Sequence, residues 1–288
     1  MRRHLRTLLV LLPVFLAARA SCAQPAVFPN QALWHVEFPG FKIAGNLYYV
    51  GTADLAVYLI HTPSGNILIN SDFPFDLPMI RRSIGQLGFQ FRDTKILLIS
   101  HAHLDHDAAV GQIQHETGAS LMVMDADVAQ VESPPPAGPG ARVDRVLHDG
   151  DTVELGGSSL VAHLTPGHTP GCTTWTMKIL DGGRQLNAVI IGSPNVNPGY
   201  ILVGNKAYPQ IAEDYVKTFA ILKALPVDLF LGAHGGYFGM QEKYKALKNG
   251  GPNPFIDPAG YHAYVAERES SFRKEWERQK LNPGSPAS

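Results

Sequence analysis

The segment ILLISHAHLDHDAAVGQ, residues 96–112, constrains this chain more than any other stretch. Its aliphatic run predicts a buried strand, and three histidines and two aspartates follow within seven positions. His101 and His103 stand two apart in an extended segment and project to the same side, so they can share one ion. Asp105 and His106 begin the next predicted helix and point elsewhere, which favours a second ion. Without a cation, such groups beside a buried strand would repel one another or stay unpaired.

Two further histidines follow apolar strands in turns of small residues. His168 lies in LTPGHTPGC and His234 in LFLGAHGGYF, where small residues let the backbone and a metal approach closely. Together with the cluster, they would satisfy two tetrahedral or five-coordinate zinc ions with a bridging water. Nitrogen and oxygen ligands without thiolate suit zinc, and iron and manganese also accept them.

The order of predicted elements repeats along the chain as strands, helix, strand, helix. Two such halves can pack sheet against sheet with helices outside, which is a four-layer α/β/β/α sandwich. The predicted helices cover residues 76–89, capped by Asp76, and 105–118, 208–225 and 258–279; a hairpin over 173–193 turns at 181–184. We interpret the Pro/Gly-rich stretch 132–141 as a surface loop within one domain, residues 24–288, with a flexible tail at about 281–288.

The N-terminus has the three parts of a secretory signal peptide. MRRHLR is positively charged, TLLVLLPVFLAA is apolar, and ARASCAQ is rich in small residues. We predict a signal peptide at 1–23, cleaved after Ala20 or, preferably, Ala23, and export to the periplasm. The apolar run is shorter than the ~20 residues that a membrane span needs, so we expect no membrane association after cleavage.

Charge and cysteine content exclude other classes of protein. The net charge of -1 provides no electrostatic footprint for nucleic acid. The chain has two cysteines; if Cys22 leaves with the signal peptide, Cys172 has no intramolecular partner. A hydrophobic content of 45% in 288 residues is ample for a core. No long apolar surface helix requires a partner, so we expect a monomer.

At this point the chain resembles the metallo-β-lactamase superfamily. HAHLDH, GHTPG and GAHGG occur in the family's order over the whole predicted mature chain. The stretches FKIAGNLYYVGTADLAVYLIHTPSGNILIN and VNPGY are similar to the third subclass of the true β-lactamases. The resemblance implies the four-layer sandwich with two zinc ions at one edge of the apposed sheets. It also implies their ligands: His101, His103 and His168 for the first zinc, and Asp105, His106 and His234 for the second.

The resemblance further implies which reaction the site performs. Zinc-bound hydroxide would open the β-lactam ring of penicillins, cephalosporins and carbapenems and so confer antibiotic resistance. Asp105 would orient the nucleophile and shuttle its proton. The subclass with a cysteine ligand is disfavoured, because that cysteine falls near Ser193 and because histidine, not arginine, follows Asp105.

Ser193 also separates the alternatives within the superfamily. Thioesterases, lactonases and many phosphodiesterases of this kind carry a metal-bridging aspartate in a GD pair, where this chain has Gly192 and Ser193. We expect Ser193 to contact the zinc-bound water, although a small residue in a tight turn is the alternative. A zinc-binding structural or scavenging protein without turnover is the rival from another class.

Three residues are candidate substrate contacts. Asn195 and Asn197 follow Ser193 and can donate hydrogen bonds to a carboxylate or carbonyl. Trp34, with Phe38, can form an apolar wall near the mature N-terminus. For each of these residues, ordinary packing is the alternative.

Overall fold

The computed structural model describes residues 30–134 and 138–287. The predicted signal peptide therefore lies outside the described residues. Within those residues, no helix is both long and apolar enough to cross a membrane.

The first sheet has seven strands in the sequential order β1 to β7. Its strands are β1 (Phe41–Ala44), β2 (Leu47–Tyr49), β3 (Tyr58–Thr62), β4 (Gly65–Ile69), β5 (Thr94–Leu98), β6 (Ser120–Met124) and β7 (Arg145–Leu147). The strands from β1 to β4 are antiparallel, and those from β4 to β7 are parallel. Parallel neighbours need crossover connections, and the helices between β4 and β6 provide them.

The second sheet has five strands in the order β12-β11-β10-β9-β8. Its strands are β8 (Thr152–Leu155), β9 (Ser158–Leu164), β10 (Thr173–Asp181), β11 (Arg184–Ile191) and β12 (Leu229–Gly232). The predicted hairpin is confirmed: Asp181 pairs with Arg184, and Gly182 and Gly183 between them both have positive φ. Two consecutive residues with positive φ suit the tight turn that matches the twist of a hairpin.

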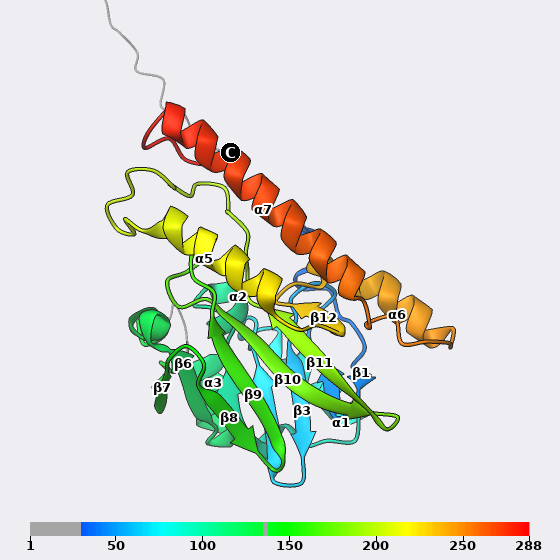
Figure 1. Cartoon of the computed structure of the whole chain (residues 1–288). Helices are drawn as coiled ribbons and strands as arrows, with labels where there is room; N and C mark the ends of the chain where they lie inside the picture. The colour runs from blue at the N-terminus through cyan, green and yellow to red at the C-terminus, as the bar shows by residue number, and fades with distance from the viewer. Residues whose placement is uncertain (1–29, 135–137, 288) are drawn as a thin grey trace, which may run out of the picture.

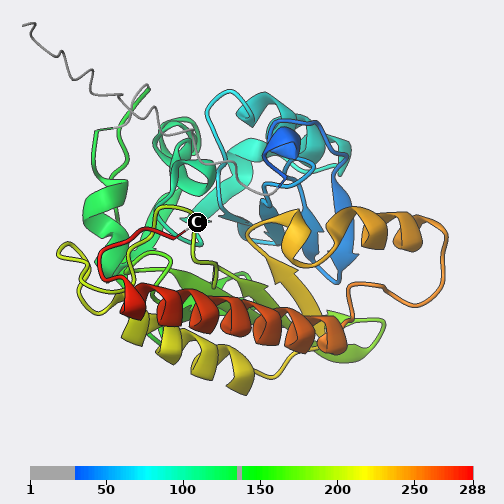
Figure 2. The same cartoon turned by 90° about the horizontal axis from the view of Figure 1, so that it is seen from above.

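Helices cover the outer faces of both sheets. They are α1 (Leu77–Gln86), α2 (Leu104–Asp107), α3 (Val110–Thr117), α4 (Val128–Val131), α5 (Ile211–Ala224), α6 (Met240–Lys248) and α7 (Pro258–Leu281). The described residues also form the short 3-10 helices η1 (Gln31–Leu33), η2 (Phe91–Asp93), η3 (Asp125–Asp127) and η4 (Gly235–Tyr237). Figures 1 and 2 show α5 and α7 side by side on the outer face of the second sheet.

Alternation along β3 explains how the layers hold together. Tyr58 and Ile60 belong to the core shared by the two sheets, whereas Leu59 belongs to the core between the first sheet and its helices. Successive side chains of a strand point to opposite faces, so a run of apolar residues can fill two cores at once. The predicted α/β/β/α sandwich is confirmed, and its two apolar layers anchor the strand ends from which the candidate site is built.

Two local predictions need correction. The helix expected over 105–118 is two helices, α2 and α3, which break at residues 108–109; Gly118 does end the second one with a φ of 68°. Asp76 precedes α1 but makes no side-chain cap bond, because its carboxylate faces His35 Nδ1 at 3.1 Å. The flexibility expected of the tail stays a prediction; in the structure the Ala287 backbone N–H donates to the Tyr200 carbonyl at 2.8 Å.

Candidate metal centre

Three segments at one edge of the apposed sheets carry the histidines and the aspartate that the sequence singled out. His101 and His103 follow β5, Asp105 and His106 lie in α2, His168 follows β9, and His234 follows β12. The carboxyl ends of β5, β11 and β12 meet at this edge, which is where open α/β sheets place ligands. The structure therefore brings all six side chains together.

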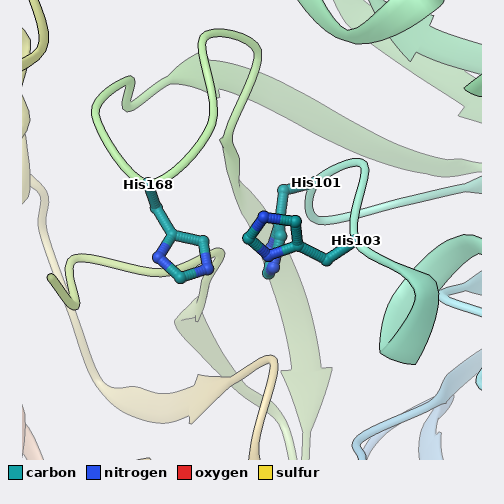
Figure 3. A group of neighbouring side chains, drawn as sticks. All are labelled: His101, His103 and His168. Atoms are coloured by element: carbon teal, nitrogen blue, oxygen red, sulfur yellow. The ribbon is translucent and has the colours of Figure 1, made fainter. Parts of the chain in front are cut away.

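The first group consists of His101, His103 and His168. One ligand atom of each lies within 4.8 Å of the other two. Figure 3 shows the three rings pointing toward one another from two turns that are far apart in the sequence. His101 is buried, and its ring centroid lies 4.6 Å from that of His168.

Hydrogen bonds on the far side of two rings orient this group. His168 Nδ1 donates to the Asn195 carbonyl at 2.8 Å, and His101 Nδ1 lies 3.1 Å from Ser100 Oγ. When Nδ1 is engaged in this way, Nε2 is left to face a metal, as is usual for metal-binding histidines. Burial lowers the pKa of His101, His103 and His168, and neighbouring histidines lower those of His101 and His168 further.

The second group consists of Asp105, His106 and His234. Asp105 Oδ2 lies 3.3 Å from His106 Nε2 and 3.4 Å from His234 Nε2, and the two Nε2 atoms are 3.2 Å apart. Ligands held tetrahedrally at about 2.0–2.1 Å from zinc lie about 3.3–3.4 Å from one another. The three atoms thus already have the mutual spacing of ligands on one small divalent cation.

Charge distinguishes the second group from the first. His234 Nδ1 donates to Asp54 Oδ2 at 2.9 Å. Burial alone would lower the pKa of His234, but hydrogen bonds to Asp105 and Asp54 raise it to about 9. Burial would raise the pKa of Asp105, yet His106 and His234 hold it below its ordinary value. Burial lowers the pKa of His106 to about 3.

A buried carboxylate joins the turns that carry the first group. Asp127 accepts hydrogen bonds from the Ala102 backbone N–H at 2.9 Å, from Thr169 Oγ1 at 2.8 Å and from the Gly171 backbone N–H at 2.7 Å. A Cβ on Gly171 would lie only 2.6 Å from Asp127 Cγ, so the turn needs glycine there. Ala102 and Thr169 adjoin ligand-bearing positions, and Asp127 therefore fixes the spacing between the two turns.

Ser193 is linked to the second group through Tyr237. Its hydroxyl is 3.2 Å from Tyr237 OH and accepts from the Asn195 backbone N–H at 3.4 Å. The Tyr237 ring in turn lies 5.1 Å from the ring of His234. The buried Cys172 thiol donates to the Ser193 carbonyl at 3.6 Å, and burial raises its pKa to about 12.

The candidate substrate contacts occupy different surroundings. The buried Trp34 ring lies 5.7 Å from His234, beside the second group. Asn195 Oδ1 lies 3.5 Å from Tyr264 OH and from Arg268 Nη1, on the side of α7. Asn197 is half-buried in the same loop. Phe38 packs into the core.

Sequence reasoning missed Asp54, Asp127, Tyr200 and Tyr237. Tyr200 OH donates to the His168 carbonyl at 2.7 Å and lies 3.4 Å from His103 Nε2. Asp54 reaches His234 across 180 positions of sequence. Neither an isolated aspartate nor a loop tyrosine stands in a recognisable spacing, so the sequence carried no signal for these contacts.

Comparisons with known proteins agree with this geometry. A family model described as the metallo-beta-lactamase superfamily matches residues 55–182. The native FEZ-1 metallo-beta-lactamase from Legionella gormanii is 54% identical, and the alignment covers 85% of this chain and 98% of that one with a TM-score of 0.83. The chain belongs to the metallo-beta-lactamase superfamily.

Other solved metallo-beta-lactamases refine this placement. The subclass B3 enzyme BJP-1 of Bradyrhizobium japonicum is 39% identical over 86% of this chain and 97% of its own, with a TM-score of 0.81. The class B3 di-zinc enzyme LRA-12 from an Alaskan soil metagenome is 34% identical over 86% and 98%, with a TM-score of 0.80. The predicted resemblance to the third subclass is confirmed, and the protein is a hydrolase of the metallo-beta-lactamase type with a metal centre.

Curated sequence relatives point to the wider superfamily. A probable metallo-hydrolase of Burkholderia pseudomallei (strain 1710b) is 36% identical over 115 residues, which are 36% of this chain and 39% of that protein. A hydroxyacylglutathione hydrolase of Rhodopseudomonas palustris (strain BisB5) is 27% identical over 191 residues, 65% of this chain and 64% of that protein. The chain thus spans less than two thirds of the length of these curated relatives.

Proposed function

We propose that this protein is a zinc-dependent β-lactamase that opens the β-lactam ring of penicillins, cephalosporins and carbapenems. The spacing of 3.2–3.4 Å among the ligand atoms of Asp105, His106 and His234 carries the proposal. These three groups, aimed at one point, fit a divalent cation. The similarity to subclass B3 enzymes over 85% or more of the chain supports the reaction class.

Two zinc ions would be held by residues already in position. His101, His103 and His168 would bind the first, and Asp105, His106 and His234 the second. When bound, zinc supplies a Lewis acid and lowers the pKa of a coordinated water from about 15.7 to about 7.

The protein's own groups position the reactants around the zinc ions. Asp105 uses Oδ2 toward His106 and His234, and we assign Oδ1 to hold the proton of the attacking water. Asp54 keeps His234 in the tautomer that presents Nε2 to the site, and the Asn195 carbonyl does the same for His168. We assign the Ser193 hydroxyl to hydrogen-bond that water.

Substrate recognition draws on the rim of the site. Trp34 provides an apolar surface beside the second group. We assign Asn195 and Asn197 to the substrate carboxylate or carbonyl; Asn195 can serve only if its side chain leaves Tyr264 and Arg268.

Thioester hydrolysis is the second candidate function, because several curated relatives are hydroxyacylglutathione hydrolases. Ser193 argues against it. Enzymes of that type carry a bridging aspartate where this chain has a buried serine bonded to Tyr237. With no carboxylate at that position, the two groups keep only Asp105 as an acidic ligand.

The test compares substrates on one metal-analysed preparation. We expect about two zinc ions per chain. We also expect hydrolysis of a carbapenem, measured as a decrease in the absorbance of the antibiotic, and this hydrolysis should stop when a chelator is added. The rate should exceed that on a homoserine lactone or a hydroxyacylglutathione thioester by orders of magnitude. Faster cleavage of the lactone or thioester would overturn the substrate assignment, and an intact antibiotic after long incubation would favour a binding protein without turnover.

We also propose that the protein acts as an exported, periplasmic monomer that protects its cell from β-lactams. Expression in a susceptible host, with and without residues 1–23, tests this: resistance should require those residues. Equal resistance from both forms would contradict the need for export.

A further inference from the structure

The chain after α7 is bonded to a loop of the candidate site. Its Gly284 backbone N–H donates to the Val203 carbonyl at 3.0 Å, and its Ala287 backbone N–H donates to the Tyr200 carbonyl at 2.8 Å. In return, the Gly199 backbone N–H donates to the Ala287 carbonyl at 2.9 Å. Figure 2 shows this red segment turning back from the end of α7 toward the middle of the molecule.

Gln279, in the last turns of α7, binds the same loop. It is fully buried; its Oε1 accepts from the Leu202 backbone N–H at 2.6 Å, and its Nε2 donates to the Tyr200 carbonyl at 3.0 Å. A buried glutamine is unfavourable unless its amide is paired, and here one side chain bonds two backbone groups of a single segment. We call Gln279 together with residues 282–287 the C-terminal clamp.

Arg278 ties the free end of the clamp to α7. Its Nη2 donates to the Pro286 carbonyl at 2.6 Å, while its Nε and Nη2 bond the Glu275 carboxylate at 2.8 and 2.6 Å. Residues 282–287 are therefore bonded on one side to the loop that contains Tyr200 and on the other side to Arg278 of α7.

The loop that the clamp holds carries Tyr200 into the first group. Gly199, Tyr200 and Leu202 are held through their backbones from outside, and on the inner side Tyr200 OH bonds the His168 carbonyl and lies 3.4 Å from His103 Nε2. The clamp thus holds the backbone of the same short segment whose side chain reaches the first group, and loss of the clamp frees that backbone to shift.

We propose that the C-terminal clamp is a positioning device for Tyr200, and that Gln279 is its principal positioning residue. The proposal rests on the proposed function, since it assigns the clamp a role in hydrolysis at that same site. The clamp itself touches none of the six candidate ligands, so it acts only through the loop.

Hydrogen exchange of the zinc-loaded protein tests the holding step without any substrate. Two variants are compared with wild type. Gln279→Met keeps the side-chain length but removes both bonds to the loop and the third bond, from Nε2 to Glu275 Oε1 at 2.7 Å. A deletion of residues 284–288 leaves α7 whole. We expect faster exchange of the amides from Tyr200 to Tyr208 in both variants. The matched control is Glu277→Gln, two residues before Gln279 in the same helix, whose side chain is 69% exposed and pairs with Lys280; it should exchange like wild type.

Kinetics test the catalytic step. Gln279→Met and the deletion should each lower kcat/KM for a carbapenem roughly ten-fold, at unchanged zinc content. In a Tyr200→Phe background, Gln279→Met should change kcat/KM by less than about two-fold, because its effect passes through the tyrosine hydroxyl. A merely structural role would give the same loss in both backgrounds.

The outcomes separate the two proposals. Unchanged exchange in both clamp variants, full additivity with Tyr200→Phe, or activity lost in step with zinc would each overturn the positioning role. If wild type hydrolyses no β-lactam, the proposed function fails, and the exchange result still decides whether the clamp holds the loop.

Discussion

The two candidate metal groups are built from similar side chains but differ in what stands behind them. The first group has only imidazoles, and its known outer partners are neutral: a backbone carbonyl for His168 and a serine hydroxyl for His101. The second contains the carboxylate of Asp105 and is backed by the carboxylate of Asp54. Burial and the neighbouring histidines thus keep the first group uncharged, whereas we expect the second group to exchange a proton for its ion. Two sites built largely from histidine can therefore differ in charge, because one carboxylate among the ligands and one behind them change the protonation of the whole group.

The largest expected effect comes from removing one ligand of either group. His101→Ala and Asp105→Ala should each lower kcat for a carbapenem by roughly 10²–10⁴-fold and lower zinc content by about one ion per chain. Both variants should stay folded by circular dichroism, because neither side chain belongs to the two apolar cores. His115→Ala, an exposed histidine of α3, is the control. Near-native turnover in either variant would remove that residue from the site.

The hydrogen-bond partners behind the two groups should differ in how strongly they affect zinc affinity. Asp54→Asn should lower zinc affinity of the second group about 10–100-fold, since it removes the charge that orients His234. Ser100→Ala, behind His101, should have a smaller effect because a neutral hydrogen bond is weaker than a charged one. Zinc titration with a competing chelator measures the zinc affinity of both variants. Equal losses of affinity would contradict the difference between the two groups.

Proton release should distinguish the groups at neutral pH. His234, with a pKa of about 9 against an ordinary 6.5, is protonated at pH 7 before metal binds, so the second zinc must displace about one proton. The first group's histidines, whose pKa values lie below 6.5, release none. Calorimetry in buffers of different ionisation enthalpy measures this; two binding events with equal proton release would contradict it.

The same shifts set opposite pH trends for stability before metal binds. The raised pKa of His234 stabilises the fold fully below pH 6.5, and that contribution is lost as the pH rises through about 9. The pKa of His106, lowered to about 3, acts in the other direction: its burial becomes unfavourable as the pH falls below 6.5. Urea unfolding of chelator-treated protein across this range should show both trends.

The smallest expected effect is that of Ser193→Ala. Loss of one hydroxyl near the second group should lower kcat roughly two- to ten-fold, the equivalent of one hydrogen bond, with zinc content unchanged. Steady-state rates on a carbapenem measure it. A loss as large as that of a ligand would mean that Ser193 does more than orient a water molecule.

Local pattern explains which features the sequence predicted. Aliphatic runs ending in polar turns located β5, β9 and β12, and with them His101, His168 and His234. The break between α2 and α3 was missed. The absence of a side-chain cap at Asp76 was also missed, because Asp76 bonds a histidine whose position the local sequence does not predict. The partners Asp54 and Asn195 were beyond reach in these roles, since each depends on how two distant turns fold together. That the six side chains bind zinc stays a prediction.

The single carboxylate of Asp127 has a consequence for ion choice. It accepts hydrogen bonds from Ala102, Thr169 and Gly171. The distance between the two turns that carry the first group is therefore set by the protein and not by the bound ion. A fixed spacing of the ligands selects ions by size. An ion such as Ca²⁺, with bonds of about 2.3–2.6 Å, would have to move the two turns apart against three hydrogen bonds. We therefore expect Asp127 to contribute to metal selectivity at this edge of the molecule although it is not one of the six candidate ligands.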